Sequence, residues 1–158
     1  MHPIKAGRKR PASPHGFLDG TLDPDQVDQW FKDSNFNLGI RTGQISKIVV
    51  LDADLYREDC GWAALVAELG RLPETYRVVT RAGGEHFYFI YPDGCEIKSS
   101  QGVVVTGVDV RCDGGYVVGP GSYVRADDKG PAGFYVLEND LPVAQLPEPW
   151  LQRLINTN

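Results

Sequence analysis

The sequence IVVLDAD at residues 48–54 constrains the fold more than any other stretch of the chain. Four consecutive apolar residues, from Ile48 to Leu51, predict a strand that is buried on both faces, as is typical of the centre of a sheet. Asp52 and Asp54 follow at the end of this strand, where a sheet opens to solvent. Because side chains alternate along a strand, both carboxylates point to the same side, with Cα atoms roughly 6.5 Å apart. They are either turn and cap residues or two ligands within reach of one shared cation.

The composition is that of one globular domain, with 158 residues of which 42% are hydrophobic and 23% are charged. No apolar segment reaches the roughly 18 residues needed to cross a bilayer, and the N-terminus lacks the apolar region of a signal peptide. We therefore expect a cytoplasmic protein with no membrane partner. Cys60, Cys95 and Cys112 form no C-x-x-C pair, which argues against a disulfide framework and against a zinc site.

The net charge of −5 gives no support to an extended nucleic-acid-binding surface, so any binding of a polyanion would depend on a local basic cluster. Lys5, Arg8, Lys9 and Arg10 form one such cluster near the N-terminus. This cluster is either a solvated tail or a set of contacts to phosphate.

The residue patterns predict a mixed α/β or α+β domain that contains antiparallel hairpins. The first 24 residues are rich in glycine, proline and basic residues, and we expect an extended segment and loop there. One helix is expected after the Asp23-Pro24 cap, a second from Trp62 to Gly70, and a third over 149–155. Trp62 is expected to be a core residue. The predicted strands, joined in pairs by glycine turns at 43–44, 83–84 and 114–115, are 37–42, 45–53, 76–81, 86–91, 103–111 and 116–118.

Four acidic or imidazole side chains fall at a strand end or just after a glycine turn: Asp52, Asp54, His86 and Asp109. Each is flanked by apolar residues, where an unpaired charge is costly, so each requires a partner. Two carboxylates about 4 Å apart repel by about 4 kcal/mol at an effective dielectric constant near 20, so three that converge would require a cation. Mg²⁺ and Mn²⁺ prefer such all-oxygen ligation and take further ligands from substrate phosphates, as in two-metal phosphoryl transfer.

His86 and Arg111 each have two interpretations. His86 follows the Gly83-Gly84 turn, whose backbone N–H groups can face an anion, so it is either a core histidine or a contact to a triphosphate. Arg111 lies two residues after Asp109 and therefore shares its face of the strand. Arg111 either forms a local salt bridge with Asp109 or points at a phosphate group.

Several motifs occur in a fixed order along the chain. They are PIK at 3–5 with KRP at 9–11, NLGIRTG at 37–43, VVLDAD at 49–54, GGEHFYF at 83–89 and GVDVRCDGGYVV at 107–118. Together these motifs resemble the archaeo-eukaryotic primase superfamily. The resemblance is strongest to the prim-pol type, the bifunctional DNA primase/polymerase N-terminal domain of plasmid, phage and mobile-element replication proteins. It extends from the N-terminus to about residue 137.

The resemblance implies that residues 1–158 form a single prim-pol catalytic domain of α+β fold. It would contain an RRM-like mixed sheet, flanking helices and a smaller α/β unit. The family motifs imply that Asp52, Asp54 and Asp109 hold two Mg²⁺ or Mn²⁺ ions. His86 would bind the triphosphate of the incoming nucleotide. The remaining expected nucleotide, phosphate or nucleic-acid contacts are Arg111, Gly83, Gly84, Lys9, Arg10 and Arg41.

The implied reaction is template-directed nucleotidyl transfer in the replication of a plasmid, phage or mobile element. A 3′-hydroxyl attacks the α-phosphate of a (d)NTP, and pyrophosphate leaves. The expected partners are a DNA template and primer, (d)NTPs and a helicase domain or protein. The sequence contains neither the C-terminal helical domain often needed for priming nor a G-x-x-x-x-G-K-[ST] helicase motif. Polymerase activity is therefore better supported than primase activity, and the domain is either a stand-alone core or a fragment of a larger replication protein.

Two alternatives remain open from the sequence. A metal-dependent nuclease could use the same carboxylates, because two metal ions serve attack by water equally well. A non-catalytic nucleotide-binding or nucleic-acid-binding module could keep the fold without the reaction. The four intact residues Asp52, Asp54, His86 and Asp109 argue against the non-catalytic module.

Overall fold

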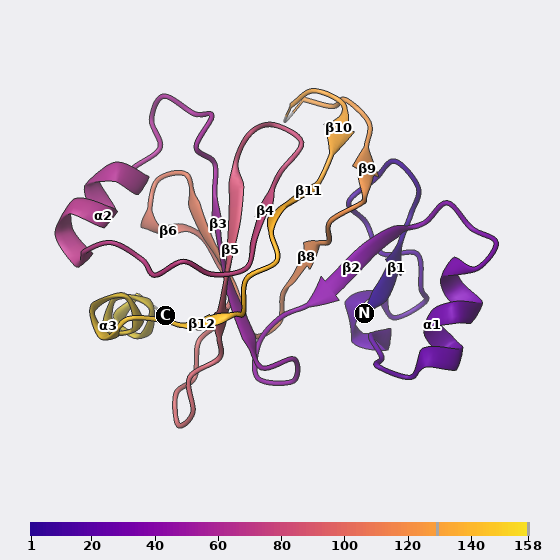
Figure 1. Cartoon of the computed structure of the whole chain (residues 1–158), viewed down its shortest axis with the longest axis horizontal. Coiled ribbons are helices and arrows are strands. Elements are labelled where there is room, and N and C mark those ends of the chain that lie inside the picture. The colour runs from indigo at the N-terminus through magenta and orange to yellow at the C-terminus, as the bar shows by residue number, and fades with distance from the viewer. Residues whose placement is uncertain (129, 158) are drawn as a thin grey trace.

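The computed structural model describes residues 1–128 and 130–157. Its centre is a seven-stranded sheet (Figure 1). The strands are β3 (Ile48–Ala53), β4 (Arg77–Val79), β5 (Glu85–Ile90), β6 (Ser100–Val105), β7 (Val108–Arg111), β11 (Val136–Asn139) and β12 (Ala144–Gln145). They lie in the order β11-β4-β5-β3-β7-β6, and β12 pairs with β5. The neighbouring strands are antiparallel, except that β12 runs parallel to β5.

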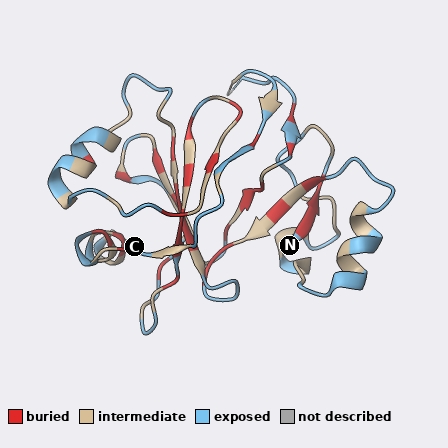
Figure 2. Ribbon diagram, in the orientation of Figure 1, coloured by how far each residue is buried: buried red, intermediate tan, exposed pale blue. Residues whose placement is uncertain are grey.

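Strand β3 lies between β5 and β7, as its apolar run predicted. Val49, Val50 and Leu51 are at most 1% exposed, so the strand is buried on both faces. Figure 2 shows that the buried residues lie mainly in strands, both those of the central sheet and those to its right. Burial of each such side chain stabilises the fold by about 1.5–3 kcal/mol, so this strand is a principal source of stability.

One face of the central sheet is covered by the helices α2 (Trp62–Leu69) and α3 (Glu148–Asn156) (Figure 1). Leu51 of β3 belongs to this core, together with Trp150 and Leu154 of α3. The Trp62 ring stacks on Phe87 with ring centroids 4.7 Å apart, so Trp62 is a core residue, as expected. Leu51 faces the helices, and its neighbour Asp52 therefore faces the opposite side of the sheet.

The opposite face packs against a smaller N-terminal unit, which lies to the right of the central sheet in Figure 1. This unit contains a three-stranded antiparallel sheet of β1 (His2–Ile4), β2 (Asn37–Arg41) and β8 (Tyr116–Val118). A 3-10 helix, η1 (Gly16–Asp19), and the helix α1 (Pro24–Phe31) complete it, and a two-stranded ribbon of β9 (Tyr123–Val124) and β10 (Gly133–Phe134) lies beside it. Asp23 caps α1 as predicted, because its carboxylate accepts a hydrogen bond of 3.1 Å from the Asp25 N–H. The fold is therefore of the expected mixed α+β class.

The predicted hairpin of residues 37–53 is wrong. Strand β2 pairs with β1 and β8 in the smaller sheet, and only an isolated bridge between Gly43 and Ile48 connects this region to β3. Gly43 (φ +93°) redirects the chain from one sheet to the other. A Cβ atom at Gly43 would lie 2.2 Å from Asp113 Oδ1, so the close approach of the two segments requires glycine.

Three further expectations differ from the structure. The hairpin predicted around the Gly114-Gly115 turn does not form, because β7 belongs to the central sheet and β8 pairs with β2 in the smaller one. The strand predicted over 103–111 is two strands, β6 and β7, which reverse at Gly107 (φ +74°). The valines on both sides of this turn made the sequence resemble one continuous strand. The segment 1–24, expected to be irregular, contains β1, whose His2 and Ile4 are completely buried. Within the described residues, no helix is long and apolar enough to cross a membrane.

Candidate active site

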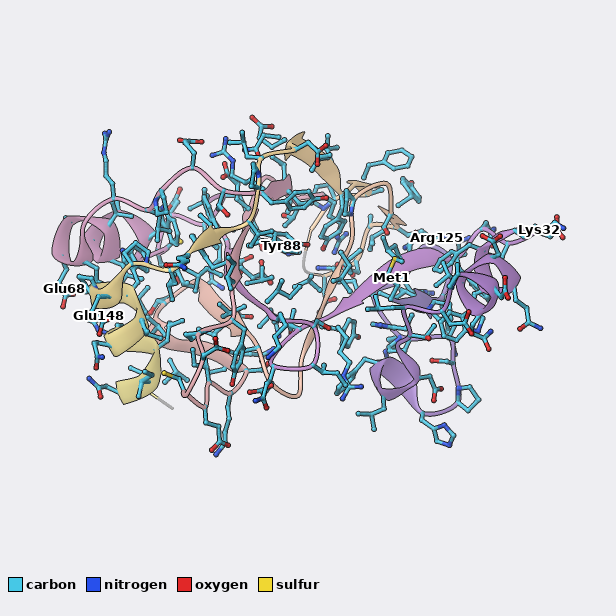
Figure 3. All side chains as sticks on the ribbon, turned by 60° about the horizontal axis from the view of Figure 1, so that its bottom comes forward. Met1, Lys32, Glu68, Tyr88, Arg125 and Glu148 are labelled. Carbon is cyan, nitrogen blue, oxygen red and sulfur yellow. The ribbon has the colours of Figure 1, made fainter. Side chains whose placement is uncertain are left out.

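The register of the central sheet places three predicted site residues in one row. Asp52 of β3 is the direct partner of His86 on β5 and of Asp109 on β7. Side chains directly opposite each other in an antiparallel pair point to the same face. A carboxylate, an imidazole and a second carboxylate therefore lie side by side on the face opposite the helices. Figure 3 shows Tyr88, on the same strand as His86, between the helical side marked by Glu68 and Glu148 and the N-terminal unit marked by Met1 and Lys32.

Asp52 lies between two nitrogen groups. His86 Nε2 is 3.3 Å from Asp52 Oδ1, and Arg111 Nη2 is 3.5 Å from Asp52 Oδ2. The same Arg111 nitrogen is 2.6 Å from Asp109 Oδ2, so the local salt bridge that the sequence allowed is present. The guanidinium group of Arg111 thus bridges two of the three predicted metal ligands.

A cavity of about 740 Å³ opens beside this row. Its lining includes all three predicted carboxylates, Asp52, Asp54 and Asp109. It also includes basic side chains from separate segments, namely Lys9, Arg57, Arg81 and Arg111. The volume lies within the range of ligand sites, roughly 300–1,000 Å³, and the mixture of charges suits a substrate that carries both anions and bound cations.

A smaller cavity of about 250 Å³ is lined by His86, which does not line the larger one. Lys9, Asp52, Arg111 and Tyr135 line both cavities, so the two meet at these residues. His86 is only 3% exposed and lies on a strand inside the sheet, not at its edge. Among the described residues, nothing forms a hydrogen bond with His86 Nδ1, although this nitrogen is buried.

The three carboxylates have different electrostatic environments. Burial opposes ionisation of Asp52, yet the adjacent His86 and Arg111 hold the pKa of its carboxyl below the usual range. Burial raises the pKa of Asp54, and the charge of Asp52 adds to this effect. Burial also raises the pKa of Asp109, against the opposing effect of Arg111. Asp52 is therefore the stably ionised member, and an added cation would relieve the unfavourable charge on the other two.

The backbone N–H groups of the glycine turn before β5 form hydrogen bonds within the turn. The Gly83 N–H donates to the Thr80 carbonyl oxygen at 3.0 Å, and the Gly84 N–H donates to Thr80 Oγ1 at 3.1 Å. Thr80 therefore accepts hydrogen bonds from both amides of the turn. A Cβ atom at Gly84 would lie 2.7 Å from the Ala53 carbonyl oxygen, so glycine allows β5 to begin close beside the end of β3.

Of the three basic residues expected to contact phosphate or nucleic acid, the structure places only Lys9 at the site. Lys9 lines both cavities, and its Nζ lies 5.8 Å from the centre of the Tyr135 ring. Arg10 is exposed and lines neither cavity. Arg41 lies over the Phe17 ring in the N-terminal unit, also outside both cavities.

Three residues of the site were not expected from the sequence: Arg57, Arg81 and Tyr135. Arg81 has a side chain only 1% exposed, pairs with Asp127 and donates to the Arg125 carbonyl oxygen at 2.9 Å. It therefore holds the segment after β9 against the cavity. Tyr135 lines both cavities and is 3% exposed. Arg81 lies two residues before the Gly83-Gly84 turn, and Tyr135 lies near the end of the region that resembles the family, so their positions are the signals that could have identified them.

The donor atoms of the candidate site determine whether it can hold divalent metal ions. Across residues 1–128 and 130–157, no three acidic, imidazole or thiol side chains are arranged as a metal-binding group. The donor chemistry nevertheless fits, because the larger cavity is lined by three carboxylates, the ligands that Mg²⁺ and Mn²⁺ prefer. The guanidinium group of Arg111 shows that the space between Asp52 and Asp109 accommodates a cation.

The fold and the site define a mixed α+β domain with a carboxylate-lined cavity on the face of its central sheet opposite the helices. The sequence matches the family model described as bifunctional DNA primase/polymerase, N-terminal, over residues 1–149 of 158. The chain therefore belongs to this family, which confirms the resemblance seen in its motifs. No curated protein matches the chain. At the level of the family, DNA primase/polymerase activity and DNA and nucleotide substrates follow from this membership.

Proposed function

We propose that the chain is a template-directed DNA polymerase/primase that transfers (d)NTPs to a 3′-hydroxyl. The observation that supports this function best is the row of Asp52, His86 and Asp109, which lies beside a carboxylate-lined cavity in a prim-pol family member. The proposed biological role is the replication of a plasmid, phage or mobile element, with a helicase domain or protein as partner. The whole chain, residues 1–158, would form one catalytic domain.

The residues that would hold two Mg²⁺ or Mn²⁺ ions are Asp52, Asp54 and Asp109. When bound, the ions would stabilise the attacking and leaving oxygens of the displacement. Asp52 is suited to anchor them because its low pKa keeps it ionised. Asp54 and Asp109 have raised pKa values, which means that their ionised forms gain most from a nearby cation.

Binding of the nucleotide is assigned to the junction of the two cavities. His86, Arg111 and Lys9 line the smaller cavity and come from three separate segments of the chain. Their nitrogen groups are suited to hydrogen bonds with a triphosphate, which are stronger when donor and acceptor are charged. Gly83 and Gly84 would contribute through the shape of the turn, since their N–H groups donate to Thr80.

Primer extension tests this function. A labelled primer–template is incubated with each nucleotide set under Mg²⁺ and under Mn²⁺, and extension that depends on both template and triphosphate is expected. Asp52→Asn should abolish extension. Glu85→Gln is a matched control, because Glu85 precedes His86, is 22% exposed and pairs with Arg77 on the opposite face of the sheet. Release of nucleotides without added triphosphate would indicate a nuclease, and binding without either reaction would indicate a non-catalytic module.

A further inference from the structure

The guanidinium group of Arg111 lies between Asp52 and Asp109, where a bound metal ion would be expected. Arg111 pairs with Val50 across β3 and β7, two residues from the pair of Asp52 and Asp109 and on the same face. Its Nη2 atom lies 2.6 Å from Asp109 Oδ2 and 3.5 Å from Asp52 Oδ2. One positive group therefore bridges two carboxylates that are direct neighbours in the sheet.

The burial of these side chains makes the bridge important for the protein without a bound ion. The side chains of Asp52, Asp109 and Arg111 are only 20%, 25% and 24% exposed. Water compensates charges poorly at this degree of burial, so two adjacent carboxylates need a cation from elsewhere. Arg111 supplies that cation from within the chain.

We propose that Arg111 is an internal counterion that competes with a divalent cation for Asp52 and Asp109. Binding of the ion between these carboxylates displaces the guanidinium group. The loss of the two ion pairs lowers the affinity of the site for the ion. The part that concerns the divalent ion rests on the proposed function, whereas the bridge itself is a feature of the structure.

The displaced guanidinium group could bind in the smaller cavity. Arg111 lines the smaller cavity together with His86 and Lys9, as well as the larger one. A triphosphate in that cavity would accept hydrogen bonds from the released guanidinium group. Binding of a triphosphate and binding of a divalent ion should therefore strengthen each other, because each favours the same displaced position of Arg111.

Measurement of Mn²⁺ affinity by electron paramagnetic resonance of the free ion tests the competition without any need for catalysis. In Arg111→Met, the Kd for Mn²⁺ should fall by roughly three- to tenfold, the range expected when two partly exposed ion pairs no longer have to be broken. Arg77→Met is a matched control. Arg77 is 30% exposed and also contacts two carboxylates, Glu85 at 3.1 Å and Glu138 at 3.7 Å, but on the opposite face. Its replacement should leave the Kd unchanged.

A second variant covers the case in which Arg111→Met does not fold, as judged by circular dichroism. Arg111→Lys keeps the charge but lacks the planar fork that contacts both carboxylates, so its Kd for Mn²⁺ should also fall, by a smaller factor. In the parent protein, a non-hydrolysable nucleoside triphosphate should lower the Kd for Mn²⁺. This effect of the triphosphate should be smaller in the variant that folds.

Each result separates this inference from the proposed function. An unchanged or higher Kd for Mn²⁺ in the folded Arg111 variant overturns the competition, and so does a parent protein that does not bind Mn²⁺ at all. If the folded Arg111 variant had an unchanged or higher Kd and primer extension were normal, the proposed function would stand without the competition between Arg111 and the ion. If the variant bound Mn²⁺ more tightly but the parent protein did not extend primers, the competition between Arg111 and the ion would stand without the proposed function.

Discussion

Each of the two larger sheets buries one histidine, and the two histidines have opposite surroundings. His86 in the central sheet is 3% exposed, with its Nε2 atom 3.3 Å from a carboxylate oxygen of Asp52. His2 in the three-stranded sheet is completely buried, and neither ring nitrogen has a hydrogen-bond partner among the described residues. The His2 ring instead meets the edge of Tyr116 at a centroid distance of 5.0 Å.

This difference shows that partners, and not burial, distinguish the candidate site from the core. Burial lowers the pKa of His2 to about 4, and the nearby amino terminus and Arg41 act in the same direction. His2 is therefore a neutral packing residue at pH 7. His86 belongs instead to a charged row that opens into a cavity, where a bound anion or cation would change the balance of charges.

The largest expected effect is a loss of catalysis in the charged row. Asp52→Asn should lower the rate of primer extension on the order of 10³-fold or more, because it removes the ionised anchor of the site. The fold should remain, since the substituted side chain has the same shape. His2→Leu should leave extension per folded molecule nearly unchanged. Single-turnover extension rates measure the activity of both variants, and circular dichroism tests whether they fold. Equal losses of activity in Asp52→Asn and His2→Leu would show that the surroundings of His86 and His2 do not differ in function.

The parts of the fold that follow from local chemistry were predictable. The buried run of β3 and the Asp23 cap of α1 each depend on residues that are close in the sequence. The pairing of β2 with β1 and β8 depends on segments that are more than 30 residues before and more than 70 residues after β2 in the sequence. No local sequence pattern contains that information. The turn at Gly43 was predicted correctly, but the strand predicted to pair with β2 was the wrong one.

The sequence allowed the residues of the candidate site to be predicted, but not the contacts between their side chains. Period-two alternation placed Arg111 on the face of Asp109, and the two side chains form an ion pair on that face. The register that sets Asp52 opposite both His86 and Asp109 is a property of three strands and could not be read from any one of them. The burial of His2 was missed because its strand has only three residues.

The second prediction concerns the pH dependence of stability that His2 should cause. In the unfolded chain, a histidine binds a proton near its ordinary pKa of 6.5, whereas in the folded protein the pKa of His2 is about 4. Between these values the unfolded state binds more protons, so stability is fully present above pH 6.5 and falls as the pH decreases toward 4. The loss should approach about 3 kcal/mol at the lower limit. Urea unfolding at pH 7, 5.5 and 4.5 measures it.

His2→Leu is the control for this prediction. It removes the titrating ring, so the difference in unfolding free energy between the parent and the variant should shift in favour of the variant as the pH falls. Other acid-sensitive groups are common to both proteins and cancel in this difference. Parallel curves for the two proteins would show that His2 does not titrate on unfolding as described.

A smaller effect is expected from the partnered histidine. His86→Gln should raise the KM for the nucleotide by roughly tenfold, the effect of losing one hydrogen bond to a charged group. The Kd for the primer–template should change little, because His86 lines only the smaller cavity. Steady-state kinetics and fluorescence anisotropy measure the two quantities. His15→Gln is the control, since His15 is exposed and pairs with Asp19 away from the site.

Equal losses for nucleotide and DNA would show that His86 supports the shape of the whole site. Loss of Mn²⁺ binding would show that it acts as a metal ligand. The first result would give His86 a structural role like that of His2. The second would give it the metal-binding role proposed for Asp52.

The smallest effect should separate Lys9 from its neighbour Arg10. Lys9 and Arg10 are both exposed, but Lys9 lines both cavities and Arg10 lines neither. Partial desolvation, followed by the charge of Arg81, lowers the pKa of Lys9. Lys9→Ala should weaken binding of single-stranded DNA by roughly three- to fivefold. It should also reduce the slope of log Kd against log salt concentration by up to about 0.7, the value for one phosphate contact on a single strand. Arg10→Ala removes the same charge from the chain and should change neither quantity. Equal effects of the two variants would show that the basic cluster acts through its net charge, in which case the placement of Lys9 over Tyr135 would have no part in binding.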